Sequence, residues 1–189
     1  MNLWMRENIV QAAECFTQQP HRTFLIQILS GWFNGKGCMP QYLGLESEEF
    51  DQMIQTYLGP LDYQFLIQKR EVFNEDRCPE REDLRTFLQG HVGPQDYTAK
   101  WFIEILIAGM MGSNHLWEDL GLFTRATLRQ FMESVFPTLA AQNVNQMRWK
   151  KFIYKQLCIA EGFTYVCRSP SCDVCPEYSL CFDTDEETQ

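Results

Sequence analysis

Apolar residues recur at spacings of three and four along most of the chain, and the strict alternation typical of a half-buried β-strand is hard to find. This pattern predicts an all-α protein of about seven or eight helices in one helical domain, residues 1–182. The expected helices are Leu3–Gln18, Thr23–Phe33, Glu48–Tyr57, Tyr63–Phe73, Glu80–Gln89, Gln95–Met111, Thr124–Val135 and Asn145–Glu161.

Glycine and proline set several of these boundaries. Pro20 follows the first expected helix, and the cluster Gly35, Gly37 and Pro40 follows the second. Ser47 is expected to cap the third helix at its start, and Gly59 with the proline after it ends that helix.

The last expected helix has two distinct faces. Trp149, Phe152, Ile153, Leu157 and Ala160 fall on one apolar face, which predicts that the helix packs against the rest of the domain. The chain that follows is thereby anchored.

A group of basic residues occupies the same helix: Arg148, Lys150, Lys151 and Lys155. One interpretation is an ordinary solvated helix face. The other is a local positive patch that holds an oxyanion or an acidic partner.

Composition and charge limit the classes of function. In a chain of 189 residues, 45% hydrophobic residues are enough to bury a core. The net charge of −9 argues against nucleic acid as a partner, because a phosphate backbone is bound by a positive field. Four of the acidic residues lie in the last seven positions, so residues 183–189 are expected to form a solvated acidic tail.

The sequence also bears on the compartment. The N-terminus lacks the basic and apolar regions of a secretory signal, and the longest apolar run, Trp101–Met111, is interrupted by Glu104 and falls short of the roughly 20 residues of a membrane span. A cytoplasmic protein without a membrane anchor is therefore expected. In a reducing cytosol, the eight cysteines of the chain are more typical of metal binding than of disulfides.

Four cysteines near the C-terminus, Cys167, Cys172, Cys175 and Cys181, have the spacing C-x4-C-x2-C-x5-C. Disulfides, a structural zinc ion and an iron–sulfur cluster are the possible explanations. Zinc sites usually have two C-x2-C pairs a dozen or more residues apart, whereas this loop has one pair flanked by two single cysteines at short range, which favours a cluster. The last three cysteines also resemble the cluster loop of endonuclease III-type DNA glycosylases, but no glycosylase hairpin with a catalytic Lys and Asp is present.

Three further segments lead into this loop: MGSNHLWEDLGL (111–122), FPTLAAQN (136–143) and MRWKKFIYKQLCIAEGF (147–163). Together with the cysteine spacing they resemble the NifQ family of nitrogen-fixation proteins, closely over about residues 109–182 and more vaguely before. The resemblance implies a molybdenum donor rather than an enzyme. It also implies a 4Fe-4S or 3Fe-4S cluster convertible to a molybdenum–iron–sulfur cubane, molybdate or another molybdenum source, and transfer to the scaffold NifEN and the reductase NifH.

Two residues outside the loop are weaker candidates. Cys158, near the end of the last helix, is either a core residue or a fifth ligand, and His115 is either a helix-start residue or a group near the molybdenum. Cys15, Cys38 and Cys78 are expected to be structural or incidental. No nucleophile with a paired base and no phosphate-binding glycine loop is recognisable, and a small iron–sulfur redox protein and a zinc-stabilised interaction domain remain the alternatives.

Overall fold

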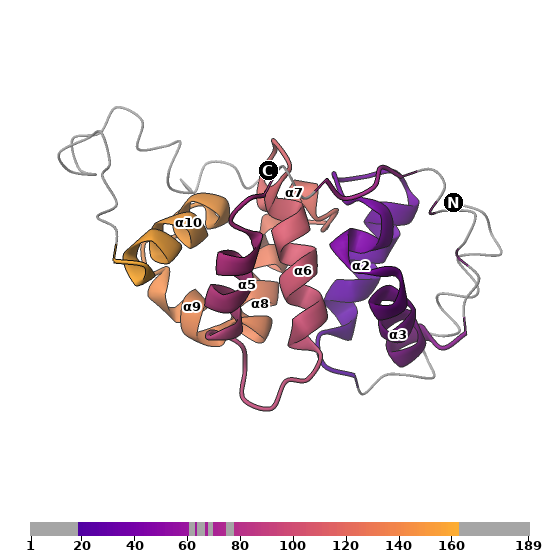
Figure 1. Ribbon diagram of the computed structural model, residues 1–189, viewed down its shortest axis with the longest axis horizontal. Helices are drawn as coiled ribbons and strands as arrows, with labels where there is room; N and C mark the ends of the chain where they lie inside the picture. The colour runs from indigo at the N-terminus through magenta and orange to yellow at the C-terminus, as the bar shows by residue number, and fades with distance from the viewer. Residues whose placement is uncertain (1–18, 61–62, 64–66, 68–69, 75–77, 163–189) are drawn as a thin grey trace.

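The computed structural model describes residues 19–60, 63, 67, 70–74 and 78–162, and these residues form helices and no strand (Figure 1). The expected all-α class is confirmed for this part. The expected helix Leu3–Gln18, the cysteine-rich loop and the acidic tail lie outside the described residues. The elements are α2 (Arg22–Phe33), the 3-10 helix η1 (Gln41–Gly44), α3 (Ser47–Leu58), α5 (Arg81–Gln89), α6 (Ala99–Met110), α7 (Leu116–Asp119), α8 (Arg125–Val135), α9 (Pro137–Gln142) and α10 (Trp149–Ala160).

Helix α6 is the central element of the fold. It runs between α2 and α3 on one side and α5, α8 and α10 on the other (Figure 1). Lys100 is the one residue of the helix that is not buried. A helix that is apolar around its whole circumference is stable in water only when neighbours cover every face, so the other helices are arranged around α6.

Aromatic rings join three helices across this core. Phe102 of α6 packs edge-on against Tyr57 of α3, with ring centroids 6.2 Å apart, and lies 5.8 Å from Phe131 of α8. Phe131 in turn contacts Phe136, the residue just before α9. All four rings are fully buried, so this chain of ring contacts joins α3 and α6 to α8 and the residue before α9.

Glu104 is a charged side chain in the apolar helix α6, and two arginines of α5 neutralise it. Its Oε2 accepts hydrogen bonds from Arg81 at 2.8 Å and 3.1 Å, and its Oε1 accepts one from Arg85 at 2.5 Å. Arg81 also donates to the carbonyl of Gly44 at 2.9 Å. Burial by itself raises the pKa of Glu104, but the hydrogen bonds from Arg85 and Arg81 outweigh it and hold that pKa below its ordinary value. The residue that interrupts the apolar run therefore fixes α5 to α6.

Two helices begin four residues later than the sequence pattern predicts, because a polar side chain organises the preceding turn. The carboxylate of Asp96 accepts from the backbone N–H and the hydroxyl of Thr98, and α6 begins at Ala99 instead of Gln95. The amide group of Asn143 likewise bonds both the N–H and the C=O of Met147, each at 2.8 Å, before α10 begins.

Other boundaries differ as well. The prediction that Ser47 caps α3 is wrong: Glu46 is the cap and Ser47 is the first helical residue. The helix expected over 63–73 lies largely outside the described residues, and its predicted end is wrong, since 70–74 are not helical. The short elements η1, α7 and α9 were not predicted as helices, because four to six residues are too few to show a period.

In the part of the chain that the structure covers, no helix has the length and apolarity needed to cross a membrane.

We expect Glu104→Gln to lower the free energy of unfolding by about 3 kcal/mol near neutral pH, because two half-buried guanidinium groups lose their counter-charge. Because folding lowers the pKa of Glu104, its stabilising effect is present above the unfolded pKa of about 4.3 and is lost as the pH falls through the folded value. Denaturant unfolding at several pH values measures both effects.

The matched control is Glu133→Gln, which removes the surface ion pair with Arg129 (2.9 Å) one helical turn away. This substitution should cost less than about 1 kcal/mol. Equal losses in the two variants, or a Glu104→Gln effect that does not decrease in acid, would contradict the role assigned to Glu104.

Candidate functional site

The four cysteines predicted to bind a metal cluster, Cys167, Cys172, Cys175 and Cys181, lie outside the described residues. Within the described part of the chain, no group of three or more His, Cys, Asp or Glu side chains is arranged to hold a metal ion. The structure does show how α10, the helix before this loop in the sequence, is held against the domain, and which groups surround that helix.

Helix α10 is packed against the domain through part of its predicted apolar face. Phe152, Ile153 and Leu157 are buried, as predicted, but Trp149 is half-buried and Ala160 is exposed. The hydroxyl of Tyr154 donates to the carboxylate of Glu80 at 2.8 Å, next to the start of α5. The anchor therefore covers the first two-thirds of the helix and weakens toward its end.

An ion pair fixes the start of α10. The ammonium group of Lys150 donates to Oδ2 of Asp119 at 2.5 Å and to the carbonyl of Gly112 at 2.7 Å. The Asp119 side chain is completely buried, and that of Lys150 is 22% exposed. Removing either partner of such a pair leaves an uncompensated charge away from water, so the contact fixes where α10 lies.

Asp119 also organises the segments around it. Its carboxylate accepts from the backbone N–H and the side-chain amide of Asn114, at 3.1 Å and 3.2 Å, and its carbonyl accepts from the N–H of Cys38 at 3.0 Å. A β-carbon at Gly112 would lie within 2.4 Å of the Asp119 carboxylate, so glycine is required there. One buried residue thus joins the loop after α2, the loop before α7 and the start of α10.

The thiol of Cys38 faces the same carboxylate. Cys38 is exposed as a residue, but its thiol is partly desolvated. This desolvation is the largest cause that raises the thiol pKa, and the charge of Asp119 is the second. Lys150 acts in the opposite direction, and the resulting pKa is about 11. The thiol is therefore protonated at neutral pH and is a poor metal ligand in this state.

The basic residues at the start of α10 and His115 lie on one cavity of about 450 Å³. Arg148, Lys150 and Lys151 line it, and Lys155 does not. Arg125, at the start of α8, lines it as well and was missed in the sequence, where it stands 23 residues before Arg148. We call this the basic cavity, and its wall is made by Ser113, Asn114, His115, Leu116, Trp117, Glu118, Arg125, Leu128, Arg148, Trp149, Lys150 and Lys151.

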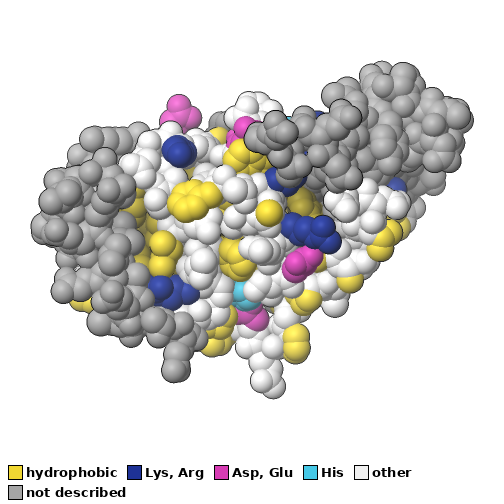
Figure 2. Space-filling model, turned by 180° about the vertical axis from the view of Figure 1, so that it is seen from behind, with side chains coloured by type: hydrophobic (Ala, Val, Ile, Leu, Met, Phe, Trp, Pro, Cys, Tyr) yellow, Lys and Arg dark blue, Asp and Glu magenta, His cyan; other side chains and the backbone are white. Residues whose placement is uncertain are grey.

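In the view from behind, Lys and Arg side chains appear on both halves of the molecule, the half that contains α10 included (Figure 2). The four basic residues of the α10 group are all half-buried rather than fully exposed. Both interpretations of this group, a solvated helix face and a patch that holds an oxyanion or an acidic partner, stay predictions.

His115 is the residue before the first turn of α7, so the helix-start interpretation is confirmed for its backbone. Its N–H donates to the carboxylate of Glu118 at 3.0 Å, as in a capping box. His115 also lines the basic cavity, which the sequence alone could not show.

A second cavity, of about 500 Å³, lies on the other side of Asp119. Cys38, Arg70, Glu71, Met111 and Asp119 are among the residues that line it. It shares Ser113 and Asn114 with the basic cavity. Asp119 lines this second cavity and Lys150 lines the basic cavity, so their ion pair lies between the two.

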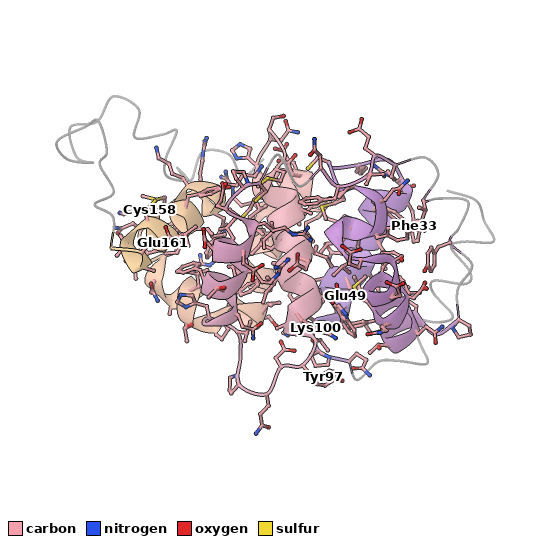
Figure 3. All side chains as sticks on the ribbon, viewed as in Figure 1. Phe33, Glu49, Tyr97, Lys100, Cys158 and Glu161 are labelled. Carbon is pink, nitrogen blue, oxygen red and sulfur yellow. The ribbon has the colours of Figure 1, made fainter. Side chains whose placement is uncertain are left out.

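Two cysteines near α10 remain free. Cys158 is half-buried and lies with Glu161 at the outer end of the helix (Figure 3). It is therefore not a core residue, and its position at the end of the described chain keeps it a candidate ligand. Cys78 is buried, and burial raises its thiol pKa to about 11, in agreement with the structural role expected for it.

The structure also joins three residues that the sequence left unconnected. The ring of His21 lies between Ser134 (2.8 Å from Nδ1) and Asp96 (2.5 Å from Nε2). Ser134 is in the last turn of α8, and the backbone N–H groups that follow it donate to helix carbonyls. They are therefore not available to stabilise an oxyanion, as a catalytic Ser–His–Asp triad requires. We interpret this trio as a tie between α2, α8 and the loop before α6.

Comparison with known proteins gives one family. Residues 24–183, which include α10 and the four cysteines, match the family model described as NifQ. The chain is 39% identical over 173 residues to protein NifQ of Azotobacter vinelandii, covering 86% of this chain and 88% of that protein. It is 41% identical to protein NifQ of Klebsiella pneumoniae over 155 residues, which cover 79% and 90% of the two chains. No solved structure matches.

We expect Asp119→Asn to lower the free energy of unfolding by about 3 kcal/mol, because Lys150 is left without its counter-charge. The thiol pKa of Cys38 should fall at the same time, since a negative charge that raises it is removed and Lys150 remains. Denaturant unfolding and the pH dependence of Cys38 alkylation, followed by peptide mass spectrometry, measure the two effects.

Lys155→Met, on the same helix but outside the ion pair, is the control and should change neither quantity by much. Adding Lys150→Met to Asp119→Asn should restore part of the stability, because no charge is then buried without a partner. A fully stable Asp119→Asn protein would show that the pair does not fix α10.

Proposed function

Because this chain belongs to the NifQ family, we propose that it carries an iron–sulfur cluster that takes up molybdenum and passes it on to cofactor assembly. Membership of the family implies a role in nitrogen fixation and in synthesis of the FeMo cofactor. The observation that carries the proposal is that the family match extends through the four cysteines of the C-terminal loop.

The proposed ligands are the thiolates of Cys167, Cys172, Cys175 and Cys181. Thiolates suit iron–sulfur units, and a cubane with one molybdenum corner needs three iron ligands and a looser contact at molybdenum if that metal is to leave. Four cysteines satisfy this requirement for a 3Fe-4S or 4Fe-4S precursor and for the molybdenum-containing form.

The anchored helix α10 supports this role physically. The loop begins seven residues after Ala160, the last residue of α10, and the other end of that helix is fixed by Lys150 and Asp119. A carrier has to present its cargo to another protein, and a helix that is fixed at its start gives the described chain before the proposed ligands a defined place on the domain. Recipients on this proposal are the scaffold NifEN and the reductase NifH.

Replacing Cys172, Cys175 or Cys181 with Ala should remove most of the bound iron, because the short spacings leave no spare thiolate nearby. Cys167→Ala, at the wider spacing, should retain a partly filled cluster. Iron and acid-labile sulfide of anaerobically purified protein are the measurements.

Cys38→Ala is the control for these variants, since it removes an exposed thiol whose raised pKa makes it a poor ligand. It should keep the full iron content. Full iron and sulfide in all three of the Cys172, Cys175 and Cys181 variants would rule these residues out as ligands.

The carrier function itself is tested by transfer. The cluster is reconstituted anaerobically, molybdate is supplied, and the protein is mixed with purified NifEN and NifH. After separation, molybdenum is measured on donor and acceptor, and we expect it to appear on the acceptor only when the donor has been loaded.

Two results would replace the proposal. Protein that holds iron but never acquires molybdenum, or never releases it, would be a small iron–sulfur redox protein. Colourless protein that contains zinc and no iron would be a zinc-stabilised interaction domain.

A further inference from the structure

We propose that Ser134 is a site of covalent acylation, made nucleophilic by His21 and Asp96. The inference is independent of the proposed function, because it involves none of the four cysteines of the C-terminal loop. It rests on a hydroxyl, an imidazole and a carboxylate that three separate segments of the chain bring into contact.

The three groups have the arrangement that activates a nucleophile. Oγ of Ser134 lies 2.8 Å from Nδ1 of His21, and Nε2 of the same ring lies 2.5 Å from Oδ2 of Asp96. A hydroxyl within hydrogen-bond reach of a base, with a third group that orients the base, is typical of serine nucleophiles. The residues are 113 and 75 positions apart in the chain, so no local sequence pattern predicts the contact.

Asp96 determines which nitrogen of His21 carries the hydrogen. Burial raises the pKa of Asp96, but hydrogen bonds from Thr98 and His21 outweigh it and hold that pKa below its ordinary value. The carboxylate is therefore ionised and only accepts hydrogen bonds, so Nε2 of the neutral ring carries the hydrogen. Nδ1 is left to accept the hydroxyl proton of Ser134, as a general base must.

The base and its carboxylate are buried, whereas the nucleophile faces solvent. The side chains of His21 and Asp96 are 8% and 9% exposed, and the ring of Phe102 packs edge-on against the imidazole at 5.4 Å. The imidazole therefore has little freedom to turn away from Ser134. Ser134 is itself exposed, so a reagent can approach its oxygen from solvent.

A second hydroxyl–imidazole pair lacks the third group. Oγ1 of Thr138 lies 2.8 Å from Nδ1 of His91, but no carboxylate among the described residues contacts that ring. The Thr138 hydroxyl also donates to the carbonyl of His91 at 3.3 Å, so its hydrogen has another acceptor. Ser113 is exposed and has no histidine partner in the described part of the chain. Thr138 and Ser113 are therefore internal references for the reactivity of Ser134.

The groups around Ser134 favour an acyl donor over a phosphoryl donor. Phosphoryl transfer depends on cations that neutralise the transferred group. The imidazole and Asp96 contribute a neutral ring and a carboxylate instead. An ester or thioester needs no such cation, so the donor class is a neutral, activated acyl group.

The proposed step is an acyl transfer that needs no oxidant or reductant. The oxygen of Ser134 attacks the carbonyl carbon and forms a C–O bond, while its proton passes to Nδ1 of His21. The bond between that carbon and the leaving oxygen or sulfur then breaks, and the leaving group takes the proton from His21. The products are an O-acyl serine and an alcohol or thiol.

The reaction is expected to stop at the acylated serine. The backbone N–H groups after Ser134 donate to helix carbonyls and do not stabilise an oxyanion. An activated donor reacts without this help because its leaving group is good, whereas a serine ester has a poor leaving group and persists. The acylated residue has no hydroxyl hydrogen to donate to His21, so acylation weakens the tie between α8 and the start of α2.

The experiment treats the full-length protein with p-nitrophenyl acetate and locates the acetyl groups by peptide mass spectrometry. We expect Ser134 to be acetylated about 100-fold faster than Ser113 or Thr138, a ratio typical of general-base assistance. The ratio of Ser134 to Ser113 should fall in acid, because a protonated imidazole accepts no proton. This comparison needs no variant and does not depend on how a substitution affects folding.

Variants identify the cause of the reactivity. His21→Gln removes the base and should lower the Ser134 rate by about 100-fold, to that of Ser113. Asp96→Asn should lower it by at least about tenfold, because the hydrogen is no longer held on Nε2. The matched control is Glu133→Gln, next to Ser134 but outside the trio, which should keep the rate within about twofold. Circular dichroism checks that each variant is folded.

Equal rates at Ser134, Ser113 and Thr138 in the unchanged protein would overturn the proposal. So would a Ser134 rate that His21→Gln leaves unchanged, or a ratio to Ser113 that is the same at about pH 5 and about pH 8. Rapid loss of the acetyl group would overturn it as well, because the trio would then be a hydrolytic site. None of these results bears on iron content or molybdenum transfer, so the proposed function is tested separately.

Discussion

The buried ion pair between Asp119 and Lys150 is the contact on which the arrangement of the candidate site depends. Asp119 is reached from three parts of the chain at once, through Lys150, Asn114 and the backbone of Cys38. A buried carboxylate of this kind tolerates few geometries, because every acceptor position has to be filled. Burying two charges costs free energy, and what the pair provides is a single defined position of α10 against α7.

The same pair lies between two cavities. On one side lies a wall rich in Lys and Arg, and on the other a cavity that contains Cys38 with its protonated thiol. The anchored start of α10 borders both regions, and the helix leads toward the cysteines.

Hydrophobic periodicity was sufficient to predict the long helices, since α2, α5 and α8 begin and end within one residue of the predicted bounds. Periodicity did not predict where α6 and α10 begin, because the side chains of Asp96 and Asn143 form hydrogen bonds with the backbone of the preceding turns. The basic group of α10 and His115 were recognisable as candidates from local sequence. Their partners Arg125 and Asp119 were not, because contacts across 23 or more residues leave no local signal.

Helix α10 is held unequally along its length. Lys150, Phe152 and Ile153 fix its first half, whereas Ile159 is 50% exposed and Ala160 has no burial to hold it. Amide hydrogens of the last turn should therefore exchange with solvent far sooner than those around Ile153, because a turn with little buried surface opens locally without global unfolding. The last turn of α10 can therefore open while the first half of the helix stays in place against the domain.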